Sequence, residues 1–360
     1  MTQPINLAEY EARARELLPR MVYDYYAGGA DDELTVAENV VAWDRLRVRP
    51  RVLVDVSQVD CRTTVLGQPI AMPVLTAPCA FNALAHPDGE RAVARAATAA
   101  GIIQVVSTAA TTSLEDVAAV PGPRWFQLYC YRDREVTRAL VLRAEAAGYA
   151  ALCVTVDVPY LGRREREVRG GFHLPPGVTL RNLEMHAADR IVAAHGESGL
   201  TNYVNSLWDP ALTWESLDWL RSITRLPIVV KGILTAEDAR LALDHGVAAI
   251  IVSNHGGRQL DGAVSGAEAL PEVVDAAMGR GEVLVDGGIR RGAHVMKALA
   301  LGARAVLIGR PYLWGLGVGG EAGVRDVLDI LRREIVLAMA LAGCPGVAQI
   351  GAGLLSGRPG

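Results

Sequence analysis

The chain lacks several features that mark other classes of protein. No apolar run reaches the ~18 residues that a membrane span needs, and the first residues lack the basic and apolar regions of a signal peptide. The formal net charge of -4 argues against a general nucleic-acid-binding protein, since such proteins usually present a basic face. The last residues are not a peroxisomal Ser-Lys-Leu signal. We therefore expect a cytoplasmic protein with no membrane or nucleic-acid partner.

Metal-binding and disulfide patterns are also missing. The 5 cysteines form no CxxC pair, and three of them lie in or beside strand-like runs, so we expect reduced packing residues. No HExxH motif occurs, and His86, His173, His245 and His294 lack the spacing of metal ligands. The sequence thus predicts no metal site.

Short β-rich runs recur along the chain with helical patterns between them. Most are near-continuously apolar, as parallel strands buried on both faces are. They are Pro73–Ala77, Ile102–Ser107, Trp125–Tyr129, Ala151–Asp157, Pro227–Lys231, Ala249–Ser253, Glu282–Asp286 and Ala305–Gly309. Arg134–Gly148 and Thr235–Gly246 have helical patterns, and the second opens with an N-cap threonine followed by acidic residues. Eight strand–helix units predict an α/β fold of the (β/α)8 TIM-barrel type. The alternative is a doubly wound sheet, but the sequence has no dinucleotide-binding fingerprint after its first predicted strand.

The whole chain, 1–360, is predicted to form a single domain with additions to a minimal barrel. Residues 1–72 form an N-terminal extension, whose helical start from Leu7 to Tyr26 we expect to cap the barrel. The barrel occupies 73–320, interrupted by an insertion at 158–226, and 321–360 form a C-terminal helix and tail. Long insertions on a barrel rim are usually lids or partner surfaces. The polar segment 187–205 within this one is expected to be mobile.

The predicted strands end in polar or glycine residues, and the C-terminal ends of barrel strands form the active site in enzymes of this fold. The most informative end is Ser253–Asp261, where His255 and Arg258 are separated by two glycines. Histidine moves protons near neutral pH, and arginine is a natural fork for a carboxylate. The segment therefore predicts a base and an anion clamp that act on one substrate.

The last two strands are followed by a phosphate-binding pattern. Asp286–Arg290 and Gly309–Arg310 place glycines and arginines where many barrels bind phosphate. The alternative is that these glycines only form tight turns. Gly315–Gly320 formally matches GxGxxG, but it does not follow a strand directly, and we predict a loop there.

Seven motifs in this order carry a resemblance to a known family. They are Val22–Gly29, Phe126–Tyr129, Thr155–Asp157, Leu161–Arg164, Val230–Gly232, Ser253–Asp261 and Asp286–Gly292. From about Tyr10 to Cys344 the chain resembles the FMN-dependent (S)-2-hydroxy acid oxidases and dehydrogenases, which include glycolate oxidase, lactate oxidase, mandelate dehydrogenase and flavocytochrome b2. The resemblance to lactate oxidase is a good fit, and hydroxymandelate oxidase comes second.

The resemblance implies roles on the substrate side. His255 would be the base that acts on the 2-hydroxy acid, and Asp157 would stabilise its imidazolium. Arg258 would bind the substrate carboxylate, with Tyr25 donating a hydrogen bond to the same group. Tyr129 would contact the substrate hydroxyl.

Arg164 would add positive charge near the substrate carboxylate. It lies in the charge-rich run Arg163–Glu167, which could alternatively be a solvated face.

The resemblance also implies an FMN site. Lys231 would lie against N1 and O2 of the flavin. The remaining FMN contacts would come from Pro78, Cys79, Ala80, Ser107, Gln127, Thr155 and Ser253, with the phosphate on Asp286, Gly287, Gly288, Arg290, Gly309 and Arg310.

The substrate and the electron acceptor are less closely defined by sequence. Ala109 stands where plant-type glycolate oxidases have tryptophan, so we expect room for lactate and for larger or aromatic 2-hydroxy acids. No membrane segment or haem domain is present, so oxygen is the favoured acceptor and hydrogen peroxide the product. The alternatives are a soluble dehydrogenase that uses a quinone or carrier, an FMN barrel isomerase, and an inactive FMN-binding scaffold. Family resemblance further implies a homotetramer or octamer.

Overall fold

The computed structural model describes residues 3–186, 191 and 197–356, and it confirms the predicted barrel. Eight parallel strands close into a ring in the order β10-β3-β4-β5-β6-β7-β8-β9. Because the sheet closes, the doubly wound alternative is excluded. Each predicted run contains or overlaps one strand: β3 Val74–Thr76, β4 Gln104–Ser107, β5 Arg124–Leu128, β6 Leu152–Thr155, β7 Ile228–Ile233, β8 Ala249–Val252, β9 Glu282–Val285 and β10 Ala305–Ile308.

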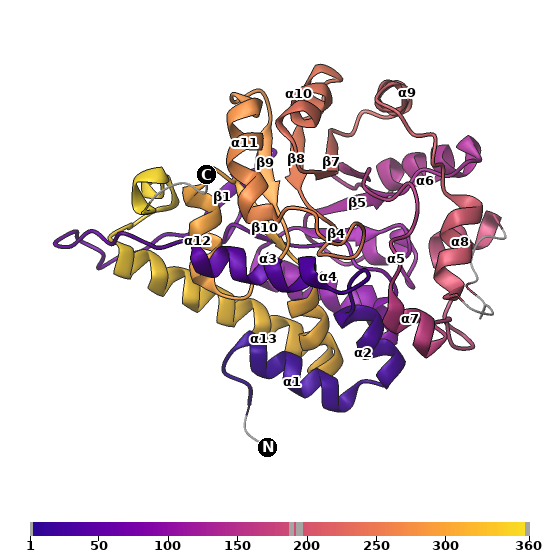
Figure 1. The fold of residues 1–360 in the computed structure, drawn as a ribbon, viewed down its shortest axis with the longest axis horizontal. Coiled ribbons are helices and arrows are strands. Elements are labelled where there is room, and N and C mark those ends of the chain that lie inside the picture. Colours follow the sequence, from indigo (N-terminus) through magenta and orange to yellow (C-terminus); the bar gives the residue numbers. More distant parts are fainter. Residues whose placement is uncertain (1–2, 187–190, 192–196, 357–360) are drawn as a thin grey trace.

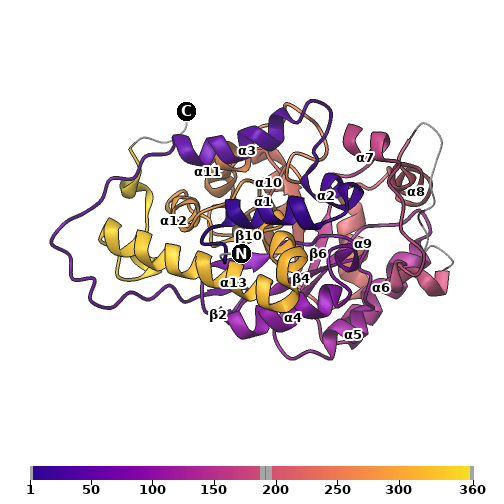
Figure 2. The same cartoon turned by 90° about the horizontal axis from the view of Figure 1, so that it is seen from below.

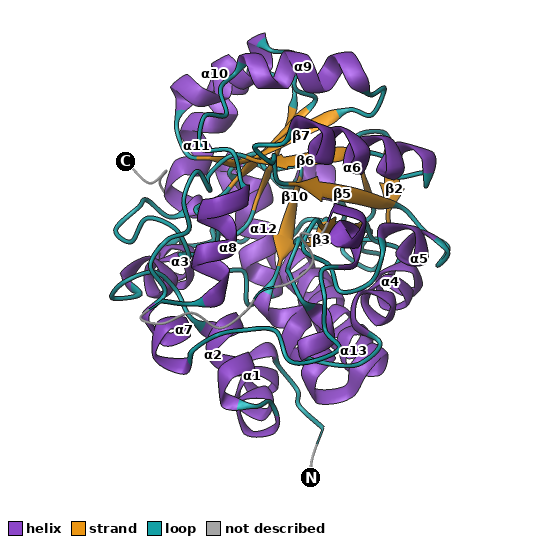
Figure 3. Ribbon diagram, turned by 90° about the vertical axis from the view of Figure 1, so that its right-hand side faces the viewer, coloured by secondary structure: helices purple, strands orange, loops and turns teal. Residues whose placement is uncertain are grey.

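Helices surround the strands on the outside of the ring (Figure 3). The two helical patterns singled out from sequence are present, with Thr235 capping the second through a 3.2 Å bond from the Asp238 amide. The helices that follow the barrel strands are α4 Gly89–Ala100, α5 Leu114–Ala118, α6 Arg134–Ala146, α9 Glu215–Ile223, α10 Ala236–Asp244, α11 Gly266–Ala277, α12 Gly292–Ala300 and α13 Arg310–Ala342.

The barrel interior is apolar at one end and polar at the other. Successive strand residues point to opposite faces, so Leu75, Ile103, Val229 and Leu284 point inward and form an interior cluster distinct from the core under the helices. Toward the C-terminal ends of the strands, the next positions that point inward are mostly polar. These next inward positions are 79, 107, 127, 155, 231, 253, 286 and 309. The strand register itself therefore gathers the predicted site residues at one end.

A β-hairpin closes the apolar end of the barrel. Strands β1 (Thr63–Val65) and β2 (Gln68–Ile70) pair antiparallel, and Val65 and Ile70 are buried in the interior cluster. The Leu66 amide donates to the Glu282 carboxylate at 2.9 Å, which ties the hairpin to the start of β9. The hairpin side chains therefore fill this end of the barrel interior.

The N-terminal extension forms three helices, and the expected helix from Leu7 to Tyr26 is broken in two. Pro19 ends α1 (Leu7–Leu17), because the residue before a proline disfavours the helical conformation, and α2 (Arg20–Ala27) starts directly after it. Helix α1 packs along α13 outside the barrel, whereas α2 and α3 (Leu34–Arg45) lie at the polar end (Figures 1 and 2).

The insertion after β6 contains α7 (Glu165–Gly170), the 3-10 helix η2 (Arg181–His186) and α8 (Gly199–Leu207) before α9. The segment 187–205, where we expect mobility, lies partly outside the described residues; its final part, 199–205, belongs to α8. Within the described ranges, no helix has both the length and the apolar character needed to cross a membrane.

The predicted loop at Gly315–Gly320 is wrong. These residues lie in α13, which is helical up to a kink at Gly319 and Gly320. A Cβ on Gly315 would lie 2.6 Å from the Gly323 carbonyl oxygen, so the two halves of the helix cross closely only because both residues are glycine. The GxGxxG pattern here serves helix packing.

Candidate active site

A cavity opens at the polar end of the barrel. It holds about 1120 Å³ when the part open to solvent is included. Its wall includes residues from seven of the eight strand ends, from α2 and from the insertion.

A histidine–aspartate pair lies at the cavity. His255 Nδ1 is 2.9 Å from Asp157 Oδ1, and Gly232 leaves room for Asp157, since a Cβ there would lie 2.6 Å from the Asp157 Cβ. Burial lowers the pKa of His255, against the opposing effect of Asp157. Burial would raise the pKa of Asp157, but His255 and Lys231 outweigh it and the pKa is lowered. The pair therefore rests as a neutral imidazole beside a carboxylate, which is a base ready to take a proton.

The backbone of the histidine segment lies in the left-handed region that favours glycine. His255, Gly256 and Gly257 all have positive φ, at 58°, 65° and 75°, a region that costs a residue with a Cβ ~1–2 kcal/mol. A Cβ on Gly257 would lie 2.7 Å from the Val36 amide of α3. The glycines predicted to allow close approach therefore approach another helix as well as the cavity.

Lys231 forms the floor of the cavity with two partners. Its Nζ donates to Ser253 Oγ at 2.8 Å and lies 3.1 Å from Asp286 Oδ2. Burial would lower the pKa of Lys231, but Asp286 and Asp157 outweigh it and raise the pKa. Lys231 therefore stays charged, and Ser253 in turn accepts the His255 amide at 3.0 Å.

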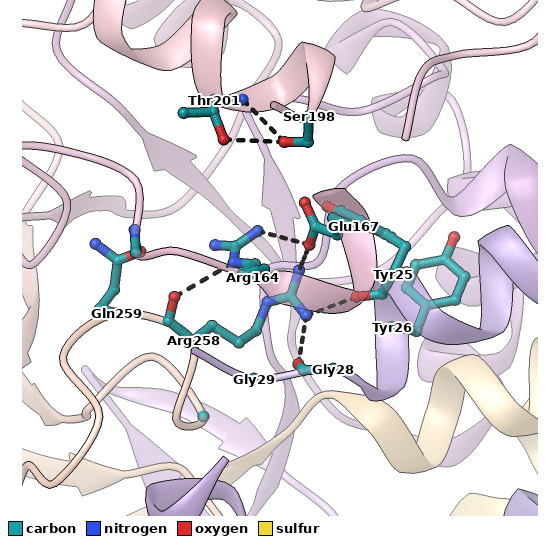
Figure 4. A network of polar contacts seen from close by, with 12 residues as sticks. Tyr25, Tyr26, Gly28, Gly29, Arg164, Glu167, Ser198, Thr201, Arg258 and Gln259 are labelled. Carbon is teal, nitrogen blue, oxygen red and sulfur yellow. Dashed lines mark hydrogen bonds and ion pairs between the residues drawn. The ribbon is translucent and has the colours of Figure 1, made fainter. Parts of the chain in front are cut away.

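Two arginines converge on the cavity from different segments. Arg258 Nη1 donates to the carbonyls of Tyr25 at 2.6 Å and Gly28 at 2.9 Å, and its guanidinium lies over the Tyr25 ring at 5.0 Å. Arg164 Nε donates to the Arg258 carbonyl at 3.3 Å. Both side chains also contact the buried Glu167 carboxylate (Figure 4).

A second basic cluster follows β9 and β10. Arg290 and Arg310 donate only to backbone carbonyls, and within the described chain neither pairs with a carboxylate. Burial together with Arg258 and Arg290 lowers the pKa of Arg310 to about 9. Positive charge gathered without a counter-charge favours an anion there.

Helix α3 supports the segment after β8 and the turn after β9, which carries Arg290. Asn39 and Asn254 exchange two side-chain hydrogen bonds of 2.9 and 2.8 Å, and Trp43 Nε1 donates to the Gly287 carbonyl at 2.8 Å. A Cβ on Gly288, at φ 75°, would overlap with the Asn39 carbonyl. The turn after β9 therefore needs glycine because α3 lies directly against it.

The rest of the wall is aromatic and apolar. Tyr129 stacks on Trp208 with ring centroids 3.7 Å apart, and Tyr25 stacks on Phe172 at 4.4 Å. In the part of the chain that the structure covers, neither tyrosine hydroxyl has a hydrogen-bond partner, and both residues line the cavity. Burial raises the pKa of each, so both remain hydrogen-bond donors.

Comparison with known proteins decides the family. The family model described as FMN-dependent dehydrogenase matches residues 14–357. The chain belongs to this family. It is 55% identical over 355 residues to the L-lactate oxidase of Nostoc sp., covering 97% of each chain, and 54% identical over 346 residues to the glycolate oxidase of Spinacia oleracea, covering 96% of this chain and 94% of the relative. A crystal structure of mandelate oxidase with (S)-4-hydroxymandelic acid matches with a TM-score of 0.93 and 48% identity, covering 96% of this chain and 97% of the other.

The resemblance inferred from sequence is thereby confirmed, and the cofactor is FMN. The residues fit that group. Arg290 and Arg310 have no carboxylate partner among the described residues, so a phosphate would supply the balancing negative charge. The charged Lys231 at the cavity floor would face the polar edge of a flavin ring.

The structure brings most predicted site residues onto one cavity wall. They are Tyr25, Pro78, Cys79, Ala80, Ser107, Ala109, Tyr129, Arg164, Lys231, His255, Arg258, Asp286, Gly287, Gly288, Arg290, Gly309 and Arg310. Four others lie behind the wall. Gln127 accepts from Ser107 Oγ at 3.2 Å and donates to Thr155 Oγ1 at 3.0 Å, while Asp157 and Ser253 contact His255 and Lys231.

Sequence reasoning missed the residues that the insertion and α3 contribute. They are Asn39 on the buried face of α3, Glu167 in α7, Tyr203 in α8, and Phe172 and Trp208 beside these helices of the insertion. One available signal was the spacing of three residues between Arg164, the N-cap of α7, and Glu167 in its first turn, which allows their side chains to meet. The charge run Arg163–Glu167 is therefore not a fully solvated face, since both of these side chains are buried.

Proposed function

We propose that this protein oxidises (S)-2-hydroxy acids to 2-oxo acids with oxygen as the electron acceptor, giving hydrogen peroxide. The observation that carries the proposal is that His255, which pairs with Asp157 at 2.9 Å, lies on the same cavity wall as Arg258. A base and a carboxylate clamp facing one cavity match a substrate with a hydroxyl and a carboxylate on neighbouring carbons.

Each side chain would have a defined task. Arg258 and Arg164 would bind the substrate carboxylate, and the free Tyr25 hydroxyl would donate to the same group. Tyr129 would donate to the substrate hydroxyl. His255 Nε2 would take a proton from the substrate, and Asp157 at Nδ1 would hold the ring tautomer and stabilise the imidazolium that forms.

FMN would be held by the cluster and floor described above. When bound, it supplies the acceptor for the two electrons that leave the substrate. Arg290 and Arg310, with the backbone of Gly287, Gly288 and Gly309, would bind the phosphate. Lys231 would face the ring, and the other predicted contacts are Pro78, Cys79, Ala80, Ser107, Gln127, Thr155, Ser253 and Asp286.

The cavity wall supports a substrate larger than glycolate. Ala109 is small and lines the cavity, and Leu161, Leu200 and the stacked pair of Tyr129 and Trp208 give apolar and aromatic surface around it. We propose that lactate and aromatic acids such as mandelate react faster than glycolate. Two of the relatives above are named lactate oxidase and mandelate oxidase and a third glycolate oxidase, so the preference rests on Ala109 and the cavity wall.

A visible spectrum during anaerobic addition of (S)-lactate, followed by air, tests the proposal. We expect a yellow protein that bleaches and then recovers with formation of peroxide. Bleaching without rapid recovery would favour a soluble dehydrogenase that uses a quinone or carrier. A colourless protein that cannot be reconstituted with FMN would refute the whole assignment.

We also propose a cytoplasmic homotetramer or octamer. The support for the cytoplasm is that all 5 cysteines are unpaired and four of them are buried, as expected of a reducing compartment. The oligomer rests on family resemblance, and light scattering of the purified protein tests it.

A further inference from the structure

Glu167 is a buried carboxylate that joins the two cavity arginines (Figure 4). Its Oε1 lies 3.2 Å from Arg164 Nη1 and 3.3 Å from Arg258 Nη2, and its side chain is 1% exposed. Its other oxygen, Oε2, is buried without a hydrogen-bond partner in the described chain. Glu167 comes from the six-residue helix α7 of the insertion and does not line the cavity itself.

The hydrogen bonds of Arg258 leave a defined set of donors for a ligand. A guanidinium has five N–H donors, and Arg258 uses two on the carbonyls of Tyr25 and Gly28 and one on Glu167. Its Nε–H and one Nη2–H have no partner among the described residues, and these two neighbouring donors suit a carboxylate. Glu167 thus occupies part of the guanidinium and leaves a fork for the substrate.

The same contacts fix the charge at this end of the cavity. Two guanidiniums and one carboxylate leave a net charge of one positive unit. We propose that Glu167 is a positioning residue that matches the site to a monoanionic substrate and disfavours dianions such as 2-hydroxy dicarboxylic acids. This inference rests on the proposed role of Arg164 and Arg258 in binding the substrate carboxylate.

Two flat, isosteric ligands that differ by one charge test the idea. Oxalate is a dianion and oxamate a monoanion, and calorimetry on the FMN-loaded enzyme gives the Kd of each without turnover. In Glu167→Gln, which keeps an acceptor oxygen but removes the charge, we expect the preference for oxalate over oxamate to rise at least about tenfold, because charges a few ångströms apart interact strongly in a partly buried site.

Matched variants separate this effect from general changes. Glu33→Gln removes the same charge from an ion pair with Arg166, which does not line the cavity, and should leave the preference as in the wild type. Glu167→Asp keeps the charge, so it should weaken both ligands while leaving their ratio unchanged. An unchanged ratio in a folded Glu167→Gln protein would overturn the proposal.

A double variant keeps the test decisive even if Glu167→Gln does not fold. Arg164→Gln/Glu167→Gln leaves no new uncompensated charge, and its preference for oxalate should exceed that of Arg164→Gln alone at least about tenfold. Equal ratios in these two proteins would refute a role for Glu167. If neither ligand binds the wild-type enzyme, or if Arg258→Gln leaves both affinities unchanged, the proposed function fails instead.

Discussion

Replacing Asp157 with asparagine should shift the pH dependence of substrate oxidation. Asp157 raises the pKa of His255 across a 2.9 Å contact, against the lowering effect of burial. A hydrogen bond to a charged group contributes ~1.5–3 kcal/mol, and about 1.36 kcal/mol corresponds to one pH unit. Asp157→Asn should therefore move the acid limb of kcat/KM ~1–2 pH units lower.

The direction follows from which form of His255 reacts. The base must be neutral, so activity rises with pH through the pKa of His255, which lies below its ordinary value of 6.5. Loss of Asp157 lowers that pKa further but also removes stabilisation of the imidazolium in the transition state. At the pH optimum, flavin reduction should therefore slow ~10–150-fold.

Stopped-flow flavin reduction under anaerobic conditions, measured from about pH 4 to pH 9 so that the shifted acid limb stays in range, checks both effects. A matched control is available, because His245 and Asp218 form a pair of the same 2.9 Å length away from the cavity. Asp218→Asn should change neither the acid limb nor the rate. An acid limb that stays in place or moves to higher pH in Asp157→Asn would falsify the assignment of the pair.

Three further changes have expected outcomes. Ala109→Trp should narrow the cavity and shift the kcat/KM ratio of mandelate to glycolate down by ~10–150-fold, since burying a phenyl-sized side chain is worth ~1.5–3 kcal/mol; an unchanged ratio would place the substrate side chain elsewhere. Arg290→Gln should weaken FMN binding to the apoprotein ~10–150-fold in a fluorescence titration. Arg291 pairs with Glu334 instead, so Arg291→Gln should leave FMN binding unchanged. Gly288→Ala should lower the free energy of unfolding in urea by ~1–3 kcal/mol or more. Gly148 also has a positive φ but no atom within 4 Å of a Cβ placed there, so Gly148→Ala should cost clearly less. Equal losses of stability would show that only the φ angle matters.

The barrel could be predicted because its strands are short, apolar and regularly spaced. Parallel strands buried on both faces leave that pattern in the sequence, and each predicted run was off by no more than a few residues at either end. Two expectations failed. The helix expected from Leu7 to Tyr26 is broken at Pro19, and Gly315–Gly320, a glycine pattern typical of turns, lies inside a kinked helix. Glycine spacing alone does not show whether a ligand or another helix approaches the backbone.

The strand-end part of the site could be predicted for the same reason, since residue order along each strand fixes which side chains meet. The contributions of Glu167, Trp208 and Asn39 could not, because they depend on how the insertion and α3 dock on the barrel. Tertiary contacts between segments so far apart in sequence leave no local period to detect.

The contact between α3 and the turn after β9 sets an order for assembly of the protein in the cell. Asn39 leaves the ribosome long before Asn254 and Gly288, its partners; at ~5–20 residues per second the delay is on the order of ten seconds or more. Throughout that interval Trp43, fully buried in the finished protein, has no surface to pack against. Helix α3 can therefore dock only after β8 and β9 have been made, and the phosphate site proposed for FMN is complete only once Arg310 has been added.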